Sequence, residues 1–292
     1  MFGVLPYFLN GLIIGSVYGL TALGLSLIFG VLRVVNIAHG SFVMVGAYIA
    51  YFAFMLWGMP PYAALAIAAA VGGVVGLALY YAVVKPTVRA GEMQNLVAMF
   101  ALGVLLAELA RILWTSNYVG YVWDVGSIAV AGLEIPLSKL FGAAAALAIA
   151  LSFQWFLAKT YLGRAMRAVV QDAVGAEIVG INVDRIFALS FALGIAITTM
   201  GGVLATLFIP VGINPYMGGE YTLAAFVIAV LGGLGSTMGS YIAGLIFGVI
   251  QSTGYYAFSA AGFPQPYAMA LFVDFLVLII VLLIKPTGLF GR

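Results

Sequence analysis

The sequence predicts an all-α integral membrane protein with about eight or nine transmembrane helices, some of them broken. Of its 292 residues, 65% are hydrophobic and only 7% are charged, whereas soluble domains are about 45–50% apolar and about 25% charged. Many apolar stretches reach the roughly 20 residues that a helix needs to cross a bilayer. They do not alternate over about 10 residues as outer-membrane strands do. We therefore expect a single transmembrane domain over residues 1–292.

Helical spans are predicted, in order, where apolar stretches are bounded by Gly, Pro or charged residues. They are Val4–Phe29, Ser41–Trp57, Tyr62–Val84, Leu96–Leu113, Ile135–Ala158, Ile186–Pro210, Tyr221–Gly235, Gly239–Tyr256 and Tyr267–Ile284. The first stretch has no basic region before it and no small-residue cleavage site, so we expect it to be a retained span. The seventh is short, and the glycine-rich run after it could lie inside the membrane rather than in a loop.

The composition also excludes several classes of function. A net charge of +2, from 11 Lys and Arg against 9 Asp and Glu, does not suit a nucleic-acid-binding protein. A single histidine, no cysteine and no clustered carboxylates leave metal catalysis without ligands. His39 and Ser41 lack an orienting acid nearby, and no Gly-x-x-x-x-Gly-Lys-Ser/Thr loop occurs. We expect no catalytic residue, metal or cofactor in this chain.

The basic residues predict the orientation, because Lys and Arg gather in short cytoplasmic loops. With nine spans they share one side: Lys85, Arg89, Lys159, Arg164, Arg167, Arg185, Lys285 and Arg292. The long segment Trp114–Glu134 has no Lys or Arg and carries Asp124 within an aromatic cluster. We expect an N-terminus outside the cell and a C-terminus in the cytoplasm.

A short repeated sequence motif predicts that the chain consists of two pseudo-repeated halves. Gly46–Ala50 recurs as Gly239–Ala243, changed only from Ala to Ser at its second residue, and Gly40 and Gly233 hold matching earlier positions. Five-residue coincidences are common in apolar sequence, so the motif alone is weak. Duplicated halves with broken helices do, however, build the central pathway of many transporters.

The first break, Gly30–Gly40, holds the only histidine of the chain, His39, together with Asn36 and the following Ser41. Polar side chains at membrane depth face a cavity or a bundle interior, and Gly40 lets the backbone approach a pathway closely. These residues therefore line a substrate pathway, or Asn36 and His39 pin the helix by bonding to neighbouring carbonyls.

The second break, Leu231–Thr237, is glycine-rich. Gly232, Gly233 and Gly235 are candidates for the same pathway. Small residues equally allow close helix packing.

A cytoplasmic loop is predicted over residues 159–185, where Gly163–Asn182 is the most polar long segment. Its apolar residues follow helical spacing, so we expect a short amphipathic helix that lies on lipid headgroups or inserts into a partner protein. Gly180 is suited to end this helix, and Asp184 to cap the next span.

Two acidic positions stand out within spans. Glu108 and Arg111 are three residues apart and could pair on one helix face. Asp274 lies well inside the last span, where it is a buried structural acid or the proton relay of an ion-coupled secondary transporter.

Four segments in order resemble the permease subunits of branched-chain amino acid ABC importers, the LivH type. They are Gly24–Gly40 with Gly46–Tyr48, Gly163–Ala168 with Gly180–Arg185, Ile213–Pro215 with Leu231–Ser236, and Lys285–Gly291. Together they extend over nearly the whole chain.

The resemblance implies a type II ABC importer permease in the bacterial inner membrane. Expected partners are a second permease subunit, which is a copy or a sister chain, two cytoplasmic ATPases that bind ATP and Mg, and a periplasmic substrate-binding protein. Asn36, His39 and Gly40 would line the pathway. Gly163, Arg164, Arg167, Asp172 and Gly180 would belong to the coupling loop that contacts an ATPase.

The chain departs from its relatives at positions that bear on docking and substrate. Relatives often carry an acidic residue and an alanine in place of Val174 and Gly175, and many carry a lysine in place of Ala224. Related permeases are associated with leucine-type amino acids, other amino acids, and urea or short amides, so these substrates stay open.

Overall fold

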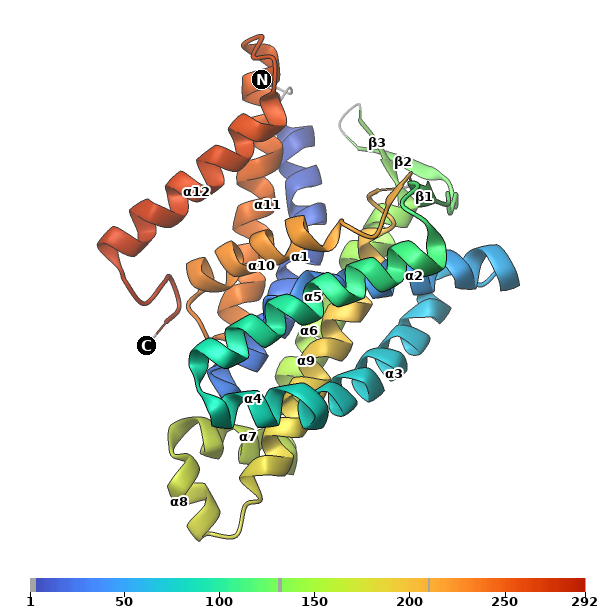
Figure 1. Ribbon diagram of the computed structural model, residues 1–292. Coiled ribbons are helices and arrows are strands. Elements are labelled where there is room, and N and C mark those ends of the chain that lie inside the picture. Colours follow the sequence, from blue (N-terminus) through green and yellow to red (C-terminus); the bar gives the residue numbers. More distant parts are fainter. Residues whose placement is uncertain (1–3, 131–132, 210, 292) are drawn as a thin grey trace.

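The computed structural model describes residues 4–130, 133–209 and 211–291, and in them the predicted all-α membrane fold is confirmed (Figure 1). The helices are α1 (Leu5–Leu32), α2 (His39–Trp57), α3 (Pro61–Leu79), a π-helix (Tyr80–Val84), α4 (Lys85–Ala90), α5 (Glu92–Trp114), α6 (Leu137–Lys159), α7 (Tyr161–Gln171), α8 (Ala173–Ile178), α9 (Val183–Ala205), α10 (Gly218–Gly232), α11 (Thr237–Ala260) and α12 (Pro266–Ile284). Short antiparallel pairs join β1 (Val119–Gly120) to β4 (Val211–Ile213) and β2 (Ser127–Val130) to β3 (Leu133–Pro136).

The number of spans differs from the nine predicted. Within the described residues, seven helices are long and apolar enough to cross a membrane. Helices α10 and α11 are predicted as two separate spans. In the structure they form one pair bent by 115°, and this pair adds at most one further span, the eighth. The 15 residues of α10 are fewer than the roughly 20 that a crossing requires. The glycine break after α10 therefore turns the chain at the end of a short helix.

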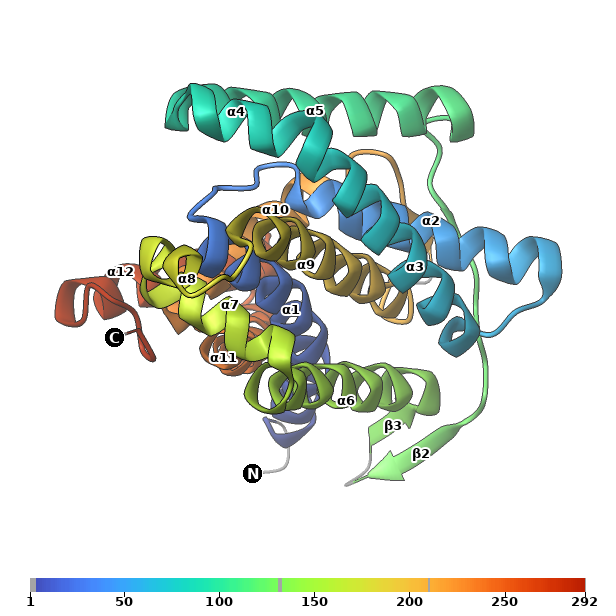
Figure 2. The same cartoon turned by 90° about the horizontal axis from the view of Figure 1, so that it is seen from below.

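Helices α1 and α9 form the centre of the bundle. Each is buried over 78% of its most apolar stretch, whereas α12, at the edge in Figure 2, is buried over 11%. Helix α1 runs beside α11 through facing glycines: Gly11, Gly15 and Gly19 on α1, and Gly244 and Gly248 on α11. A Cβ atom on Gly15 would lie 2.7 Å from the carbonyl oxygen of Gly244, so the two backbones touch.

The bundle has two distinct ends. We call the end that carries β2 and β3 the strand end, and the opposite one the α7–α8 end (Figure 1). Lys85 pairs at 2.7 Å with Asp184 in the first turn of α9, the helix that follows α8, which places the start of α4 at the α7–α8 end. The tail Thr287–Gly291 packs on the α10–α11 break, which in turn contacts Gly30 near the last turn of α1. The two ends of the chain therefore lie at opposite ends of α1.

Side-chain caps set several of the helix starts. Thr160, Asp172, Asn182 and Ser236 each accept a hydrogen bond from a backbone N–H in the first turn of the next helix. Asn182, not the predicted Asp184, caps α9. Asp184 lies two residues further on, in the first turn of α9, and accepts hydrogen bonds from the Lys85 ammonium at 2.7 Å and the Tyr80 hydroxyl at 2.9 Å.

Candidate functional site

The first break is shorter than predicted and covers Arg33–Ala38, because α1 continues to Leu32 and α2 begins at His39. Gly40 and Ser41 therefore lie in the first turn of α2. His39 is fully buried, and its Nε2 lies 3.0 Å from the backbone oxygen of Thr21 on α1. Because a carbonyl only accepts, Nε2 carries the proton and donates. This bond holds the start of α2 against the middle of α1, as the pinning alternative requires.

Helix α2 also meets α10 and α5 at this point. The backbone N–H of Gly40 donates to the hydroxyl of Thr222 at 2.8 Å, and a Cβ atom on Gly40 would collide with the carbonyl oxygen of Gly218. The hydroxyl of Ser41 donates to the carbonyl of Gly103 at 3.4 Å. The start of α2 is thus held by contacts from three helices.

Three polar atoms in the first break and the residue after it have no hydrogen-bond partner within the described residues: Asn36 Oδ1, Asn36 Nδ2 and His39 Nδ1. Asn36, like His39, is fully buried. An unpaired buried polar group costs about 1–3 kcal/mol. The Asn36 amide and His39 Nδ1 therefore destabilise the arrangement in which they are buried.

Substituting His39 with alanine removes the bond to Thr21. We expect the protein to lose about 1–3 kcal/mol of stability, measured as a lower midpoint of thermal unfolding in detergent. Ser41→Ala, which removes only the 3.4 Å bond to Gly103, should have a smaller effect. Unchanged stability of His39→Ala together with altered transport would instead assign His39 to substrate contact alone.

The second break lies at the α7–α8 end and packs tightly. Gly233 and Gly235 have φ values of 96° and 89°, which L side chains rarely adopt. A Cβ atom on Gly232 would lie 2.6 Å from Gly239, and one on Gly235 would lie 3.1 Å from Gly30. The backbone N–H of Leu289 donates to the carbonyl of Leu231 at 2.8 Å. The C-terminal tail thus supplies a hydrogen-bond donor to a carbonyl in the last turn of α10. This geometry favours the packing alternative for these glycines.

The segment 159–185 forms two helices instead of the single amphipathic helix predicted. Asp172 ends α7 and caps α8, accepting from the N–H groups of Val174 and Gly175 at 3.0 Å. Gly180 closes the segment with a φ of 88° and lets the chain turn into α9. Asp172 therefore ends one helix and begins the next, since an Asp side chain that bonds to nearby backbone N–H groups favours a helix start over a helix interior.

Helix α7 is anchored in the bundle by its apolar face. Met166 and Val169 pack in the core cluster that includes Val31 and Ile186. Gly163 lies so close to the end of α6 that a Cβ atom would meet the backbone there. Arg164 and Arg167 are exposed, and their guanidinium groups donate to the carbonyls of Lys159 and Leu157, respectively. Both arginines therefore also secure α7 to α6.

Helix α8 and the residue after it, Val179, present apolar side chains that no other part of the described chain covers. Val174, Ile178 and Val179 are 69%, 81% and 75% exposed. Ile178 and Val179 were missed in the sequence, because their exposure follows from the break at Asp172. The signal that could have found them is an apolar pair directly before Gly180 in the most polar segment of the chain.

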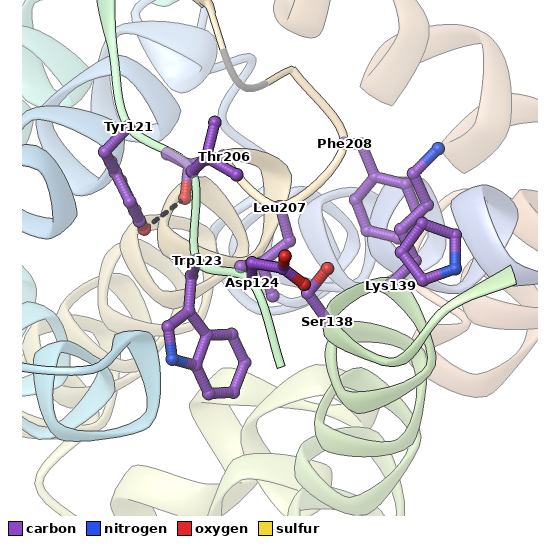
Figure 3. Close-up of a pocket in the computed structure, with 10 residues that line it drawn as sticks. Tyr121, Trp123, Asp124, Ser138, Lys139, Thr206, Leu207 and Phe208 are labelled. Carbon is purple, nitrogen blue, oxygen red and sulfur yellow. Dashed lines mark hydrogen bonds between the residues drawn. The ribbon is translucent and has the colours of Figure 1, made fainter. Parts of the chain in front are cut away.

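Two cavities lie near the strand end. A smaller one, of about 250 Å³, is lined by Tyr121, Trp123, Asp124, Ser138 and Lys139, and the Tyr121 hydroxyl lies 2.7 Å from that of Thr206 (Figure 3). A larger one, of about 430 Å³, lies between α1, α10, α11 and α12. No group of three or more His, Cys, Asp or Glu side chains suited to a metal occurs in the part of the chain described.

The two acidic positions behave differently. The predicted pair of Glu108 and Arg111 is confirmed, with 2.6 Å between Oε2 and Nε, and the Tyr216 hydroxyl donates to Glu108 at 3.1 Å. Asp274 is buried at 2% exposure, and neither carboxylate oxygen has a hydrogen-bond partner among the described residues.

Apolar helices that cross a membrane, a buried polar break between two of them and an anchored amphipathic segment at one end define a multi-pass membrane permease. The chain belongs to the family described as branched-chain amino acid transport system / permease component, whose model matches residues 7–282. It is a transport subunit of a multi-component system and not an enzyme.

Three relatives illustrate the similarity. The high-affinity branched-chain amino acid transport system permease protein LivH of Salmonella typhimurium is 32% identical over 97% of this chain and 94% of its own length. BraD of Pseudomonas aeruginosa, of the same description, is 30% identical over 99% and 96%. A probable branched-chain amino acid transport permease protein LivH of Methanocaldococcus jannaschii is 29% identical over 97% and 91%.

A solved structure, PsaBC from Streptococcus pneumoniae in complex with Fab, covers 96% of this chain and 92% of that chain. Its TM-score is 0.48 at 14% sequence identity.

Proposed function

We propose that this chain forms the translocation pathway of an ABC importer for branched-chain or related amino acids in the inner membrane. It pairs with a second permease subunit, receives its solute from a periplasmic binding protein and is driven by two cytoplasmic ATPases that bind ATP and Mg. Relatives named for branched-chain amino acid transport over nearly their whole length support the substrate class. The observation that carries the proposal is the exposed apolar surface of α8 beside an anchored α7.

The orientation follows from charge and from the tail. Lys85, Arg164 and Arg167 lie at the α7–α8 end, and the C-terminal tail packs there, whereas α1 begins at the opposite end. Cytoplasmic loops carry an excess of Lys and Arg. The α7–α8 end therefore faces the cytoplasm, and the N-terminus and the strand end face the periplasm. Arg292 lies outside the described residues.

The segment 159–185 couples the ATPase to the pathway. Its exposed part, α8, supplies the docking contact through Val174, Ile178 and Val179. Its buried part, α7, packs on α1 and α9. A displacement of α8 by the ATPase is therefore transmitted through α7 to the two central helices. Asp172 and Gly180 fix the two turns of the segment. Nucleotide shifts the equilibrium between two conformations only if the ATPase binds them unequally, and this contact supplies the difference.

The first break acts as the gate of the pathway. In the closed arrangement His39 pins α2 to Thr21, while Asn36 and His39 Nδ1 stay buried and unpaired. When α2 moves, these atoms and the first turn at Gly40 and Ser41 face the solute and water, which satisfies them. The stored cost of about 1–3 kcal/mol for each unpaired group offsets part of the cost of opening. Gly232, Gly233 and Gly235 keep the cytoplasmic end of α10 packed on the tail.

A secondary transporter is the competing function, and the buried, unpaired Asp274 is the observation that favours it. The two are separated by isolating the chain from its native membranes in mild detergent and identifying the bound proteins by mass spectrometry. We expect the bound proteins to include an ATPase with Walker motifs and a second permease, each recovered in stoichiometric amounts. Recovery of this chain alone, active in vesicles without ATP, would overturn the importer.

A further inference from the structure

The larger cavity is built for a small organic solute. Its volume of about 430 Å³ lies within the range of about 300–1,000 Å³ typical of small-molecule sites. Its walls come from α1, which supplies Tyr18, and from three consecutive helices: α10 supplies Glu220 and Tyr221, α11 supplies Phe247, and α12 supplies Tyr267. The segment that leads into α10 adds to the lining. A site at the meeting of a bent pair and two other helices is positioned to change shape when these helices move.

The apolar wall of the cavity is an aromatic cluster. The rings of Tyr18 and Tyr221 lie 5.9 Å apart between centroids, and those of Tyr18 and Phe247 lie 5.5 Å apart in an edge-to-face arrangement. Leu271 and Phe275 extend the apolar lining along α12. Such a wall accepts a branched aliphatic side chain by burying its surface, and aromatic faces also attract a cation.

The charge in the cavity has one sign. Glu220 is the only charged residue among the described residues that line it. Glu220 takes part in neither of the two ion pairs found in the described chain, which join Lys85 to Asp184 and Arg111 to Glu108. The Tyr216 hydroxyl at the rim binds Glu108, whose charge Arg111 already balances. The cavity therefore has one carboxylate, on the exposed side chain of Glu220, without an ion-pair partner in the described chain.

We infer that this cavity is the periplasmic recognition chamber for the amino acid, in which the carboxylate of Glu220 binds the ammonium group and the aromatic wall holds the aliphatic side chain. The inference rests on the proposed import function. Gln251, which also lines the cavity and is 6% exposed, offers amide N–H donors for the carboxylate of the solute.

Other ligand classes fit the lining less well. A divalent cation needs several oxygen ligands, and the lining has a single carboxylate. An anion would meet Glu220 with no Lys, Arg or His among the described lining residues to bind it. Urea or a neutral amide carries no positive charge, so it would leave the Glu220 carboxylate without a charged partner. An amino acid with an aliphatic side chain matches the Glu220 carboxylate, the Gln251 amide and the aromatic wall together.

The chain has no cysteine, which allows a direct test in the intact complex. Leu223 lines the cavity and is half exposed, so Leu223→Cys places a thiol there. Leucine at millimolar concentration should slow labelling of this thiol by a neutral maleimide at least threefold. The deaminated analogue 4-methylpentanoate should not. Val122→Cys, exposed on the loop at the strand end, is the control that leucine leaves unchanged.

Adding Glu220→Gln to Leu223→Cys should abolish the protection by leucine, and Glu220→Asp should retain part of it. Equal protection by leucine and 4-methylpentanoate, or no protection in a complex that imports leucine with ATP, would overturn the chamber while leaving the proposed function standing. A complex that shows neither protection nor ATP-driven leucine import would overturn both. Co-purification of the ATPase with each variant confirms that it has folded and assembled.

Discussion

Replacing Ile178 with glutamate is expected to abolish ATP-driven transport and to weaken capture of the ATPase about thirtyfold or more. Ile178 is 81% exposed at the end of α8 and supports nothing else in the described chain. A central apolar contact in a protein interface contributes about 2–4 kcal/mol, and a charge there would have to be desolvated. The measurement is the amount of ATPase that is retained when the variant is isolated from membranes.

The matched control is Val122→Glu, which makes the same kind of change at a side chain that is 68% exposed on the opposite end of the molecule. It should retain the ATPase fully. If Ile178→Glu holds the ATPase as well as the unaltered protein does, the docking role of α8 is wrong.

Replacing Gly244 with leucine is expected to prevent folding or to lower stability by about 3 kcal/mol or more. A Cβ atom at Gly244 would meet the backbone of Gly19 on α1, where no flexible side chain can move aside. Overpacking against side chains already costs about 1–3 kcal/mol, and a rigid backbone has less room to relax. The measurement is the yield of monodisperse protein in detergent and its thermal unfolding midpoint.

Gly73→Leu provides the control, because nothing lies within 4 Å of a Cβ atom built on Gly73 in α3. It should fold with normal yield. Equal behaviour of Gly244→Leu and Gly73→Leu would show that the glycine contact between α1 and α11 does not hold the bundle.

The spans could be predicted because each depends on the composition of its own stretch. The predicted span boundaries that differ from the structure depend instead on contacts between residues that are remote in sequence. Helix α1 continues to Leu32, ends where Arg33 takes a left-handed conformation, and packs Gly30 near its last turn against Gly235, which is remote in sequence. The bend between α10 and α11 is fixed by positive φ values at Gly233 and Gly235 and by the tail that packs there. Neither partner is visible from the apolar pattern.

The candidate site could be predicted only in part for the same reason. Asn36 and His39 stand out in the sequence as polar residues at membrane depth, but the partner of His39 is a backbone carbonyl at Thr21, and any residue type supplies one. Asp172 was expected within a continuous helix, where its capping bonds to Val174 and Gly175 instead end it. Glu220 becomes a candidate binding residue only because the folded bundle places it beside aromatic residues from three other helices.

Leucine uptake by vesicles containing the isolated complex tests the central claim most directly. ATP is enclosed on the α7–α8 side, the binding protein is supplied on the strand side, and a protonophore is added in a parallel sample. We predict uptake that requires the enclosed ATP and continues when the proton gradient is collapsed. Uptake that proceeds without ATP and stops with the protonophore would contradict the account and assign transport to a proton relay at Asp274.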